Sequence, residues 1–204
     1  MENKFRSNLD ETVKYYEEHA QEFIESTISA DVTELYEHFE KHLTSDAKIL
    51  DLGCGSGRDS KYFVEKGYRV VAIDPSAAMC EQTRELAHIP VYQMKAEQMN
   101  FSNEFDAVWA CASLLHVPLK DQGKVLQKIT DALKTGGILY ASWKYGEGEY
   151  VTGERCFINM NEKDLHVILK SVSKLETIKI WETQDVRKNM QHQKWINVLT
   201  RKID

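Results

Sequence analysis

The sequence has few of the features that mark secreted, metal-binding or membrane-spanning proteins. Its cysteines are scattered, form no CxxC pair and lack metal-ligand spacing with histidine; they are Cys54, Cys80, Cys111 and Cys156. We therefore expect reduced thiols and no metal site. The first ten residues are polar and mixed in charge, unlike a secretory signal. No apolar run approaches the length of a membrane span. These absences predict a cytoplasmic protein with no membrane partner.

The chain also lacks an excess of positive charge. It has 26 Lys and Arg residues against 32 Asp and Glu residues, a net charge of -6. Nonspecific affinity for nucleic acid comes from basic residues that release counterions. A general nucleic-acid binder is therefore disfavoured, although a local basic patch, and with it a nucleic-acid partner, stays open. The sequence does not give the oligomeric state.

The hydrophobic pattern changes near residue 48. The first forty-odd residues have helical spacing, whereas later apolar runs alternate with amphipathic stretches, which is typical of βαβ units and a parallel sheet. The predicted strands are 48–52, 69–73, 90–94, 105–111 and 137–143. The predicted helices between them are 58–66, 76–87, capped by Ser76, and 120–134.

The last third of the chain has a different pattern. A helix is predicted over 161–171, and two strands, 175–181 and 195–200, are joined by a polar stretch, which favours an antiparallel pair at one sheet edge. Residues 145–157 contain three glycines and predict a flexible loop. The predicted fold is therefore a doubly wound, Rossmann-like α/β domain with a mostly parallel sheet, an antiparallel C-terminal edge pair and an N-terminal helical segment. We expect one domain over 1–204, divided into 1–46, 47–144 and 145–204.

A glycine-rich turn follows the first predicted strand. Asp51-Leu52-Gly53-Cys54-Gly55-Ser56-Gly57 leads from the strand into a helix, where a ligand can lie across the carboxyl end of the sheet. Arg58 stands where the dinucleotide fingerprint GxGxxG has its third glycine, and the chain has no GK[ST] phosphate loop. The turn therefore favours a nucleoside ligand without a pyrophosphate over NAD or ATP.

Asp74 ends the next predicted strand. A carboxylate in this position can accept hydrogen bonds from both hydroxyls of a ribose. The alternative is an acid that stabilises the N-terminus of the helix after Ser76. The order and separation of Asp74 and the glycine turn favour the ribose contact.

These motifs resemble those of class I S-adenosylmethionine-dependent methyltransferases. Residues 51–57 are similar to motif I and Asp74 to the acid of motif II, and the resemblance continues at 96–101, 105–109, 114–118 and 133–139. It covers about residues 48–143. Gly57-Arg58-Asp59-Ser60 is also similar to the tellurite-resistance methyltransferases within that family.

The resemblance implies a cofactor, S-adenosyl-L-methionine, and a set of residues that contact it. The implied contacts are Gly53, Gly55 and Gly57 under the methionine and ribose, Asp51 at the methionine amino group, Asp74 at the ribose, Met79 on the adenine ring, Ala96 and Glu97 at its edge, and Cys111 near the methyl donor. The family often has Asp where Lys95 stands, and Lys95 cannot accept from the adenine amino group. Either Glu97 or backbone alone then meets that edge.

Other residues have open alternatives. His116 is the candidate catalytic base, with an ordinary pKa near ~6.5, or a turn histidine that packs or caps. In similar enzymes the N-terminal helix covers the cofactor, so Tyr15 or Tyr16 either contacts the sulfonium or packs in the core. Arg58 either binds the methionine carboxylate or pairs with a neighbouring acid. Four residues line an acceptor pocket for an anion or lie on a solvated surface: Lys144, Tyr145, Arg155 and Arg187.

The predicted function is methyl transfer, with a small molecule as the expected acceptor. The [DNS]PPY motif is absent after the fourth strand, where Ala110-Cys111-Ala112-Ser113 stands, and the chain has no Pro-Cys dipeptide. Amino-methylation of adenine or glutamine and a covalent cytosine mechanism are therefore disfavoured. Three alternatives are kept: a cofactor-binding partner subunit without activity, a tRNA-directed methyltransferase, and an NAD-dependent oxidoreductase, which Arg58 disfavours.

Overall fold

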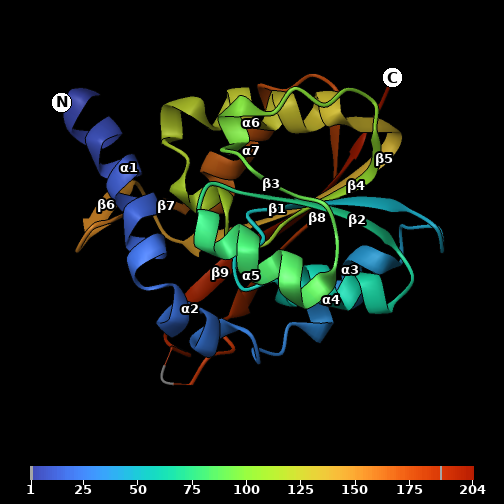
Figure 1. Ribbon diagram of the computed structural model, residues 1–204. Helices are drawn as coiled ribbons and strands as arrows, with labels where there is room; N and C mark the ends of the chain where they lie inside the picture. The colour runs from blue at the N-terminus through green and yellow to red at the C-terminus, as the bar shows by residue number, and fades with distance from the viewer. Residues whose placement is uncertain (1, 189) are drawn as a thin grey trace.

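The structure is a computed structural model that describes residues 2–188 and 190–204, with side chains from Asp10 onward. Three helices come first along the chain: α1 (Glu2–Glu18), α2 (Ala20–Thr27) and α3 (Thr33–Glu40). A mixed sheet follows, with helices on both faces (Figure 1).

The parallel part of the sheet has the order β3-β2-β1-β4-β5. Its strands are β1 (Lys48–Leu52), β2 (Arg69–Asp74), β3 (Val91–Gln93), β4 (Phe105–Ala110) and β5 (Leu133–Tyr145). On the far side of β5, β9 (Lys194–Lys202) runs antiparallel to it, and β8 (Leu175–Gln184) pairs antiparallel with β9. The predicted doubly wound sheet with an antiparallel C-terminal edge pair is therefore confirmed.

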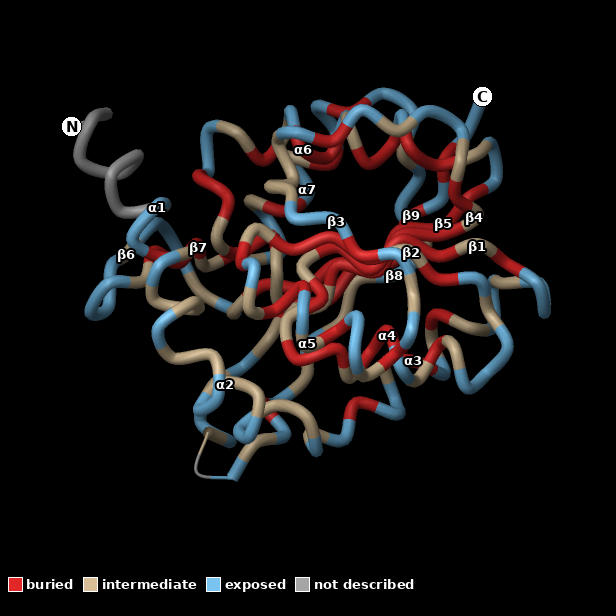
Figure 2. The backbone as a smooth tube through the Cα atoms, viewed as in Figure 1, coloured by how far each residue is buried: buried red, intermediate tan, exposed pale blue. Residues whose placement is uncertain are grey.

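Helices pack on both faces of this sheet. Helices α6 (Leu119–Ala132) and α7 (Glu162–Lys170) cover one face, while α3, α4 (Arg58–Glu65) and α5 (Ala77–Ala87) lie on the other (Figure 1). Side chains alternate along β4 because successive strand residues point to opposite faces. Val108 packs in the cluster of Leu126 and Ile129, whereas Trp109 packs in the cluster of Phe39. The buried residues follow these strands and the helix sides that face them (Figure 2).

Two predicted helices begin at side-chain caps, one of them the expected Ser76. The Ser76 hydroxyl accepts from the Met79 amide at 3.2 Å, and Asn161 Oδ1 accepts from the Asp164 amide at 2.8 Å. Each cap satisfies an amide that has no partner inside the helix. The cap at Ser76 fixes where α5 begins, directly after the end of β2.

The flexible loop predicted over 145–157 is wrong. These residues belong to an antiparallel hairpin of β6 (Glu149–Thr152) and β7 (Arg155–Met160), and β7 continues beside the end of β5. The glycines lie at the turns and not along the strands: Gly153, with φ 59°, forms the two-residue turn of the hairpin together with Glu154. Glycine content therefore gave the wrong prediction here, while buried Phe157 and Ile158 anchor β7 in the core.

The N-terminal helix α1 is joined to two parts of the sheet domain. Thr12 Oγ1 accepts from the Cys156 amide on β7 at 2.9 Å. The Glu17 carboxylate accepts from the amides of Ala77 and Ala78 at the start of α5, the second at 3.1 Å. Helix α1 thus bridges β7 and α5 (Figure 1). None of the described helices is long and apolar enough to cross a membrane.

Candidate functional site

The glycine turn places backbone close to its neighbours. Gly53 and Gly57 have φ of 78° and 80°, a region that L side chains rarely adopt. A Cβ added at Gly53 would lie 2.4 Å from the Ser113 Cβ, and one at Gly57 would lie 3.0 Å from the Thr83 Cα on α5. Gly53 therefore permits the approach of the segment after β4, and Gly57 permits the packing of α4 against α5.

Asp74 lies at the carboxyl end of β2, with both oxygens fixed by backbone. Oδ2 accepts from the Gly55 amide at 3.0 Å, and Oδ1 accepts from the Ser76 amide at 2.9 Å. Burial raises its pKa to about 6, although the hydrogen bonds from Ser76 and Gly55 lower it. Since a carboxylate oxygen can accept two hydrogen bonds, each oxygen of Asp74 can still accept one from a ligand.

A crevice runs along the carboxyl ends of the parallel strands, where ligands bind in open α/β sheets. It consists of two adjoining lobes of about 570 Å³ and about 840 Å³. The first lobe lies over β2 and residues 94–98, and the second extends past β4 toward β5, β7 and the segment after β8. Residues that line both lobes mark their junction: Tyr16, Phe23, Gly53, Gly55, Ala112 and His116.

Most of the predicted site residues line this crevice. Those that do are Tyr16, Gly53, Gly55, Arg58, Asp74, Ala96, Glu97, Cys111 and His116. Asp51, Gly57 and Met79 are not among the lining residues. Asp51 is 1% exposed and accepts from the Ser60 hydroxyl at 2.6 Å, and Met79 is 1% exposed in α5. The contacts expected of these three residues stay predictions.

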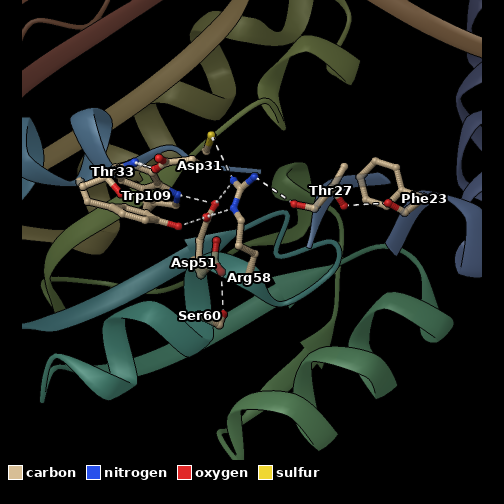
Figure 3. Close-up of polar contacts among 11 residues, drawn as sticks. Phe23, Thr27, Asp31, Thr33, Asp51, Arg58, Ser60 and Trp109 are labelled. Carbon is tan, nitrogen blue, oxygen red and sulfur yellow. Dashed lines mark hydrogen bonds and ion pairs between the residues drawn. The ribbon is translucent and has the colours of Figure 1, made fainter. Parts of the chain in front are cut away.

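Arg58 is paired with its neighbour in sequence (Figure 3). Its Nε and Nη2 donate to the two oxygens of Asp59 at 2.6 and 3.0 Å. Asp59 also accepts from Trp109 Nε1 at 2.8 Å and from the Tyr36 hydroxyl. Burial pushes the Asp59 pKa up, but Arg58 and these hydrogen bonds hold it below its ordinary value. Arg58 thus makes the second of the two contacts considered from the sequence.

The same buried charges affect Asp51. Burial, and then the nearby charge of Asp59, raise the pKa of Asp51 to about 8, while the hydrogen bond from Ser60 acts in the opposite direction. Asp51 comes from β1 and Asp59 from α4, and they are near enough for the charge of Asp59 to act on Asp51. Two carboxyl groups this close do not both ionise easily, so Asp59 holds the charge beside Arg58.

His116 and Tyr16 form a hydrogen-bonded pair at the junction of the lobes. His116 Nδ1 lies 2.7 Å from the Cys156 carbonyl oxygen, which only accepts, so Nδ1 carries the proton. Nε2 then accepts from the Tyr16 hydroxyl at 3.0 Å. Burial first, and then Arg155 and Lys144, lower the His116 pKa to about 4, so the ring is neutral near pH 7. Nε2 is therefore a neutral acceptor at the junction of the lobes, and in this structure it accepts from Tyr16.

Three contacts that shape the crevice could not be predicted from the sequence. Phe23 packs against the glycine turn, since a Cβ at Gly55 would lie 3.1 Å from its ring. Glu17 joins α1 to α5, as described above. Lys95, which replaces the acid usual in the family, donates to Asp10 at 2.7 Å. Lys95 and Asp10 are 85 positions apart, so local pattern does not connect them.

Comparison with known proteins shows what the central part of the chain is similar to. A family model described as a methyltransferase domain matches residues 49–137. A ubiquinone biosynthesis O-methyltransferase from Nitrobacter winogradskyi is 34% identical over 100 residues, which are 47% of this chain and 38% of that protein. Residues 49–137 are therefore similar to a methyltransferase domain, in keeping with the resemblance to the class I S-adenosylmethionine-dependent methyltransferases. The chain spans well under half the length of this relative.

Two further comparisons extend over more of the chain. A carboxy-S-adenosyl-L-methionine synthase from Photorhabdus laumondii is 25% identical over 77% of this chain and 69% of its own. The crystal structure of the 1,6-didemethyltoxoflavin-N1-methyltransferase from Burkholderia thailandensis, with 1,6-didemethyltoxoflavin and S-adenosylhomocysteine bound, has a TM-score of 0.80. It is 20% identical and covers 99% of this chain and 90% of its own. At this identity the likeness supports the fold, including the N-terminal helices and the C-terminal strands.

Proposed function

We propose that this chain is an enzyme that transfers a methyl group from S-adenosylmethionine to a small-molecule acceptor. The observation that carries the proposal is one crevice with two differently built lobes. The first has a glycine turn and a buried carboxylate, Asp74, and the second adjoins it at the neutral base His116. Such a crevice has room for a nucleoside and a second molecule side by side.

The residues of the first lobe fit the cofactor. Each Asp74 oxygen can accept one further hydrogen bond, which suits the two hydroxyls of a ribose. Beside Gly53, the buried Ser113 hydroxyl has no hydrogen-bond partner among the residues that the structure describes. Ala96 and Glu97 line the same lobe and would meet the adenine edge. Lys95 is paired with Asp10, so the adenine ring would be bound without the acidic residue that the family usually has at this position.

The cofactor, when bound, supplies a methyl group that is already activated on a sulfonium. The chain then has to position the acceptor and remove its proton. Positioning matters because alignment of the two reactants alone accounts for much of the rate of such a displacement. His116 Nε2 is the group that accepts the proton, in place of the hydrogen bond that it now receives from Tyr16. The His116 Nδ1–H bond to the Cys156 carbonyl keeps the ring in this tautomer.

Calorimetric titration with S-adenosylmethionine and S-adenosylhomocysteine tests the binding half of the proposal. Both ligands should bind the purified chain, and NAD should not raise its melting temperature. Absence of cofactor binding would remove the basis of the proposal.

Transfer of a labelled methyl group to separate metabolite and tRNA pools tests the chemistry. Label in small molecules with the lone purified chain is the expected result. Label only in tRNA would assign a macromolecular acceptor. Binding of the cofactor without transfer to either pool would instead support a partner subunit that does no chemistry itself.

A further inference from the structure

The second lobe of the crevice has four cationic side chains in its walls, and they differ in their partners. Arg58 is paired with Asp59, and Arg187 donates to both oxygens of Asp185 at 2.9 and 2.6 Å. Lys144 and Arg155 have no such partner: among the described residues, no carboxylate oxygen lies within 4 Å of either. Among the described residues, the walls of the lobe therefore hold two cations that have a carboxylate partner and two that have none.

The two uncompensated cations are held near each other. The Lys144 Nζ lies 3.8 Å from the centroid of the Phe157 ring, and the Arg155 guanidinium lies 5.3 Å from the same centroid. Lys144 also donates to the Tyr150 hydroxyl at 2.9 Å, and Arg155 lies over the Tyr15 ring at 4.4 Å. The Arg155 Nε is buried and has no hydrogen-bond partner among the described residues. Aromatic side chains thus fix both cations but leave their charge unmatched.

Acidic residues elsewhere in the lobe do not neutralise this charge. Glu182 accepts a hydrogen bond from Lys194 at 2.9 Å, and Lys194 is not one of the residues that line the lobe. Asp31 accepts a hydrogen bond from the Thr33 amide. The Glu34 side chain is 72% exposed and lies beside His38. Burial first, and then Arg155 and Arg187, lower the pKa of Lys144 to about 8, while Asp185 acts in the opposite direction. The electrostatic cost of holding two like charges in a half-buried wall is relieved when an anion binds between them.

We propose that the methyl acceptor is a small organic acid whose carboxylate is held between Lys144 and Arg155. The proposal rests on the proposed function, and it assigns the substrate class. Both cations lie over the Phe157 ring, and the centroid of that ring is 5.0 Å from the centroid of the His116 ring at the lobe junction. An acid anchored on them would extend toward the Tyr16–His116 pair, and Phe157 and Trp195 would contact its carbon skeleton. An arginine fork is well suited to bind a carboxylate in this way.

Matched pairs of ligands that differ in one charge test this proposal. The protein, saturated with S-adenosylhomocysteine, is titrated in a calorimeter with 4-hydroxybenzoate and 4-hydroxybenzamide, with benzoate and benzamide, and with indole-3-acetate and indole-3-acetamide. We expect the acid of at least one pair to bind at least about tenfold more tightly than its amide. Equal affinities within every pair, or binding by no member of any pair, would overturn the proposal.

The pH dependence provides a second readout. Affinity for the acid should fall as the pH rises through about 8, because Lys144 loses its proton there. The charged or titratable groups around Lys144 are Arg155 on β7, Tyr150 on β6, His116 after β4, and Arg187 with Asp185 after β8. Affinity for the amide should stay constant over the same range. An acid affinity that is constant from pH 7 to pH 9 would contradict the assignment of Lys144.

Variants separate the acceptor from the cofactor as the source of the bound carboxylate. Lys144→Met and Arg155→Met should each lower the acid-over-amide preference by about tenfold, and Arg155→Lys should restore part of it. Affinity for S-adenosylhomocysteine should stay within about twofold of the parent. The matched control is Lys61→Met, which removes one charge on the exposed surface of α4.

An equal loss of affinity for S-adenosylhomocysteine in both methionine variants would mean that the cations hold the cofactor's own carboxylate, and it would overturn the proposal. Failure of the parent to bind S-adenosylhomocysteine at all would instead contradict the proposed function. The two failures are therefore distinguishable in the same set of titrations.

Discussion

Replacing Asp74 by Asn should separate cofactor affinity from stability. Asp74 is 8% exposed, and its pKa is raised from 3.8 to about 6, mainly by burial. In the ligand-free protein, folding therefore makes the ionised form of Asp74 less favourable than it is in the unfolded chain. The stability that the protonated form provides is complete below pH 3.8 and is lost as the pH rises through about 6. At pH 7 the ionised carboxylate costs about 3 kcal/mol of folding free energy.

An asparagine removes that cost but also removes one acceptor. Its single carbonyl oxygen can accept from the amide of Gly55 or of Ser76, not from both. Leaving a buried amide unsatisfied costs roughly 1–3 kcal/mol. The two effects offset each other, so the Asp74→Asn protein should melt within a few degrees of the parent. The control, Glu85→Gln, makes the same charge change on the exposed side of α5.

Cofactor affinity, in contrast, should fall strongly. A hydrogen bond to a charged group contributes about 1.5–3 kcal/mol, and the variant loses the charge that both ribose hydroxyls would use. A loss of about 3 kcal/mol corresponds to roughly a 150-fold weaker Kd. Calorimetry with S-adenosylhomocysteine measures it, and the parent's own affinity should decline as the pH falls below about 6. A variant Kd within threefold of the parent, with an unchanged melting temperature, would refute the ribose contact.

Three other variants test separate parts of the site. His116→Ala should lower the turnover rate by about 10²–10⁴ with little change in the Kd of S-adenosylhomocysteine; a rate within a factor of three of the parent would show that His116 is not the base. Gly53→Ala places a Cβ 2.4 Å from Ser113 at a φ of 78°, and should lower the free energy of unfolding by roughly 1–3 kcal/mol; denaturant melts that coincide with the parent's would contradict that geometry. Glu17→Gln weakens the anchor of α1 on the start of α5, so amides of α1 should exchange with solvent faster; unchanged hydrogen exchange there would show that the anchor does not hold the helix.

The sheet and the first lobe follow from local sequence patterns. Alternating apolar runs gave the strands and the glycine turn gave the ligand end of the sheet, because strand period and backbone freedom are properties of neighbouring residues. The pairing of β8 with β9 was also predictable from two apolar runs joined by a polar stretch. The hairpin of β6 and β7 was missed because its glycines, which lie at the turns, outweighed the short strand patterns.

The second lobe depends on contacts between distant parts of the chain. Tyr16 and His116 are 100 positions apart, and Lys95 meets Asp10 across 85 positions. The sequence left Arg58 open between the cofactor and Asp59, and only the three-dimensional arrangement shows the bidentate pair. That Lys144 and Arg155 have no carboxylate partner among the described residues was equally hidden, because it depends on which acids the fold brings near them.

A crystal structure of the chain with S-adenosylhomocysteine bound would show directly where the nucleoside lies. We expect adenosine in the first lobe, both ribose oxygens on the Asp74 carboxylate, and the sulfur directed at the junction where Tyr16 meets His116. Density for the nucleoside elsewhere on the molecule, or in the first lobe with its ribose turned away from Asp74, would contradict this expectation.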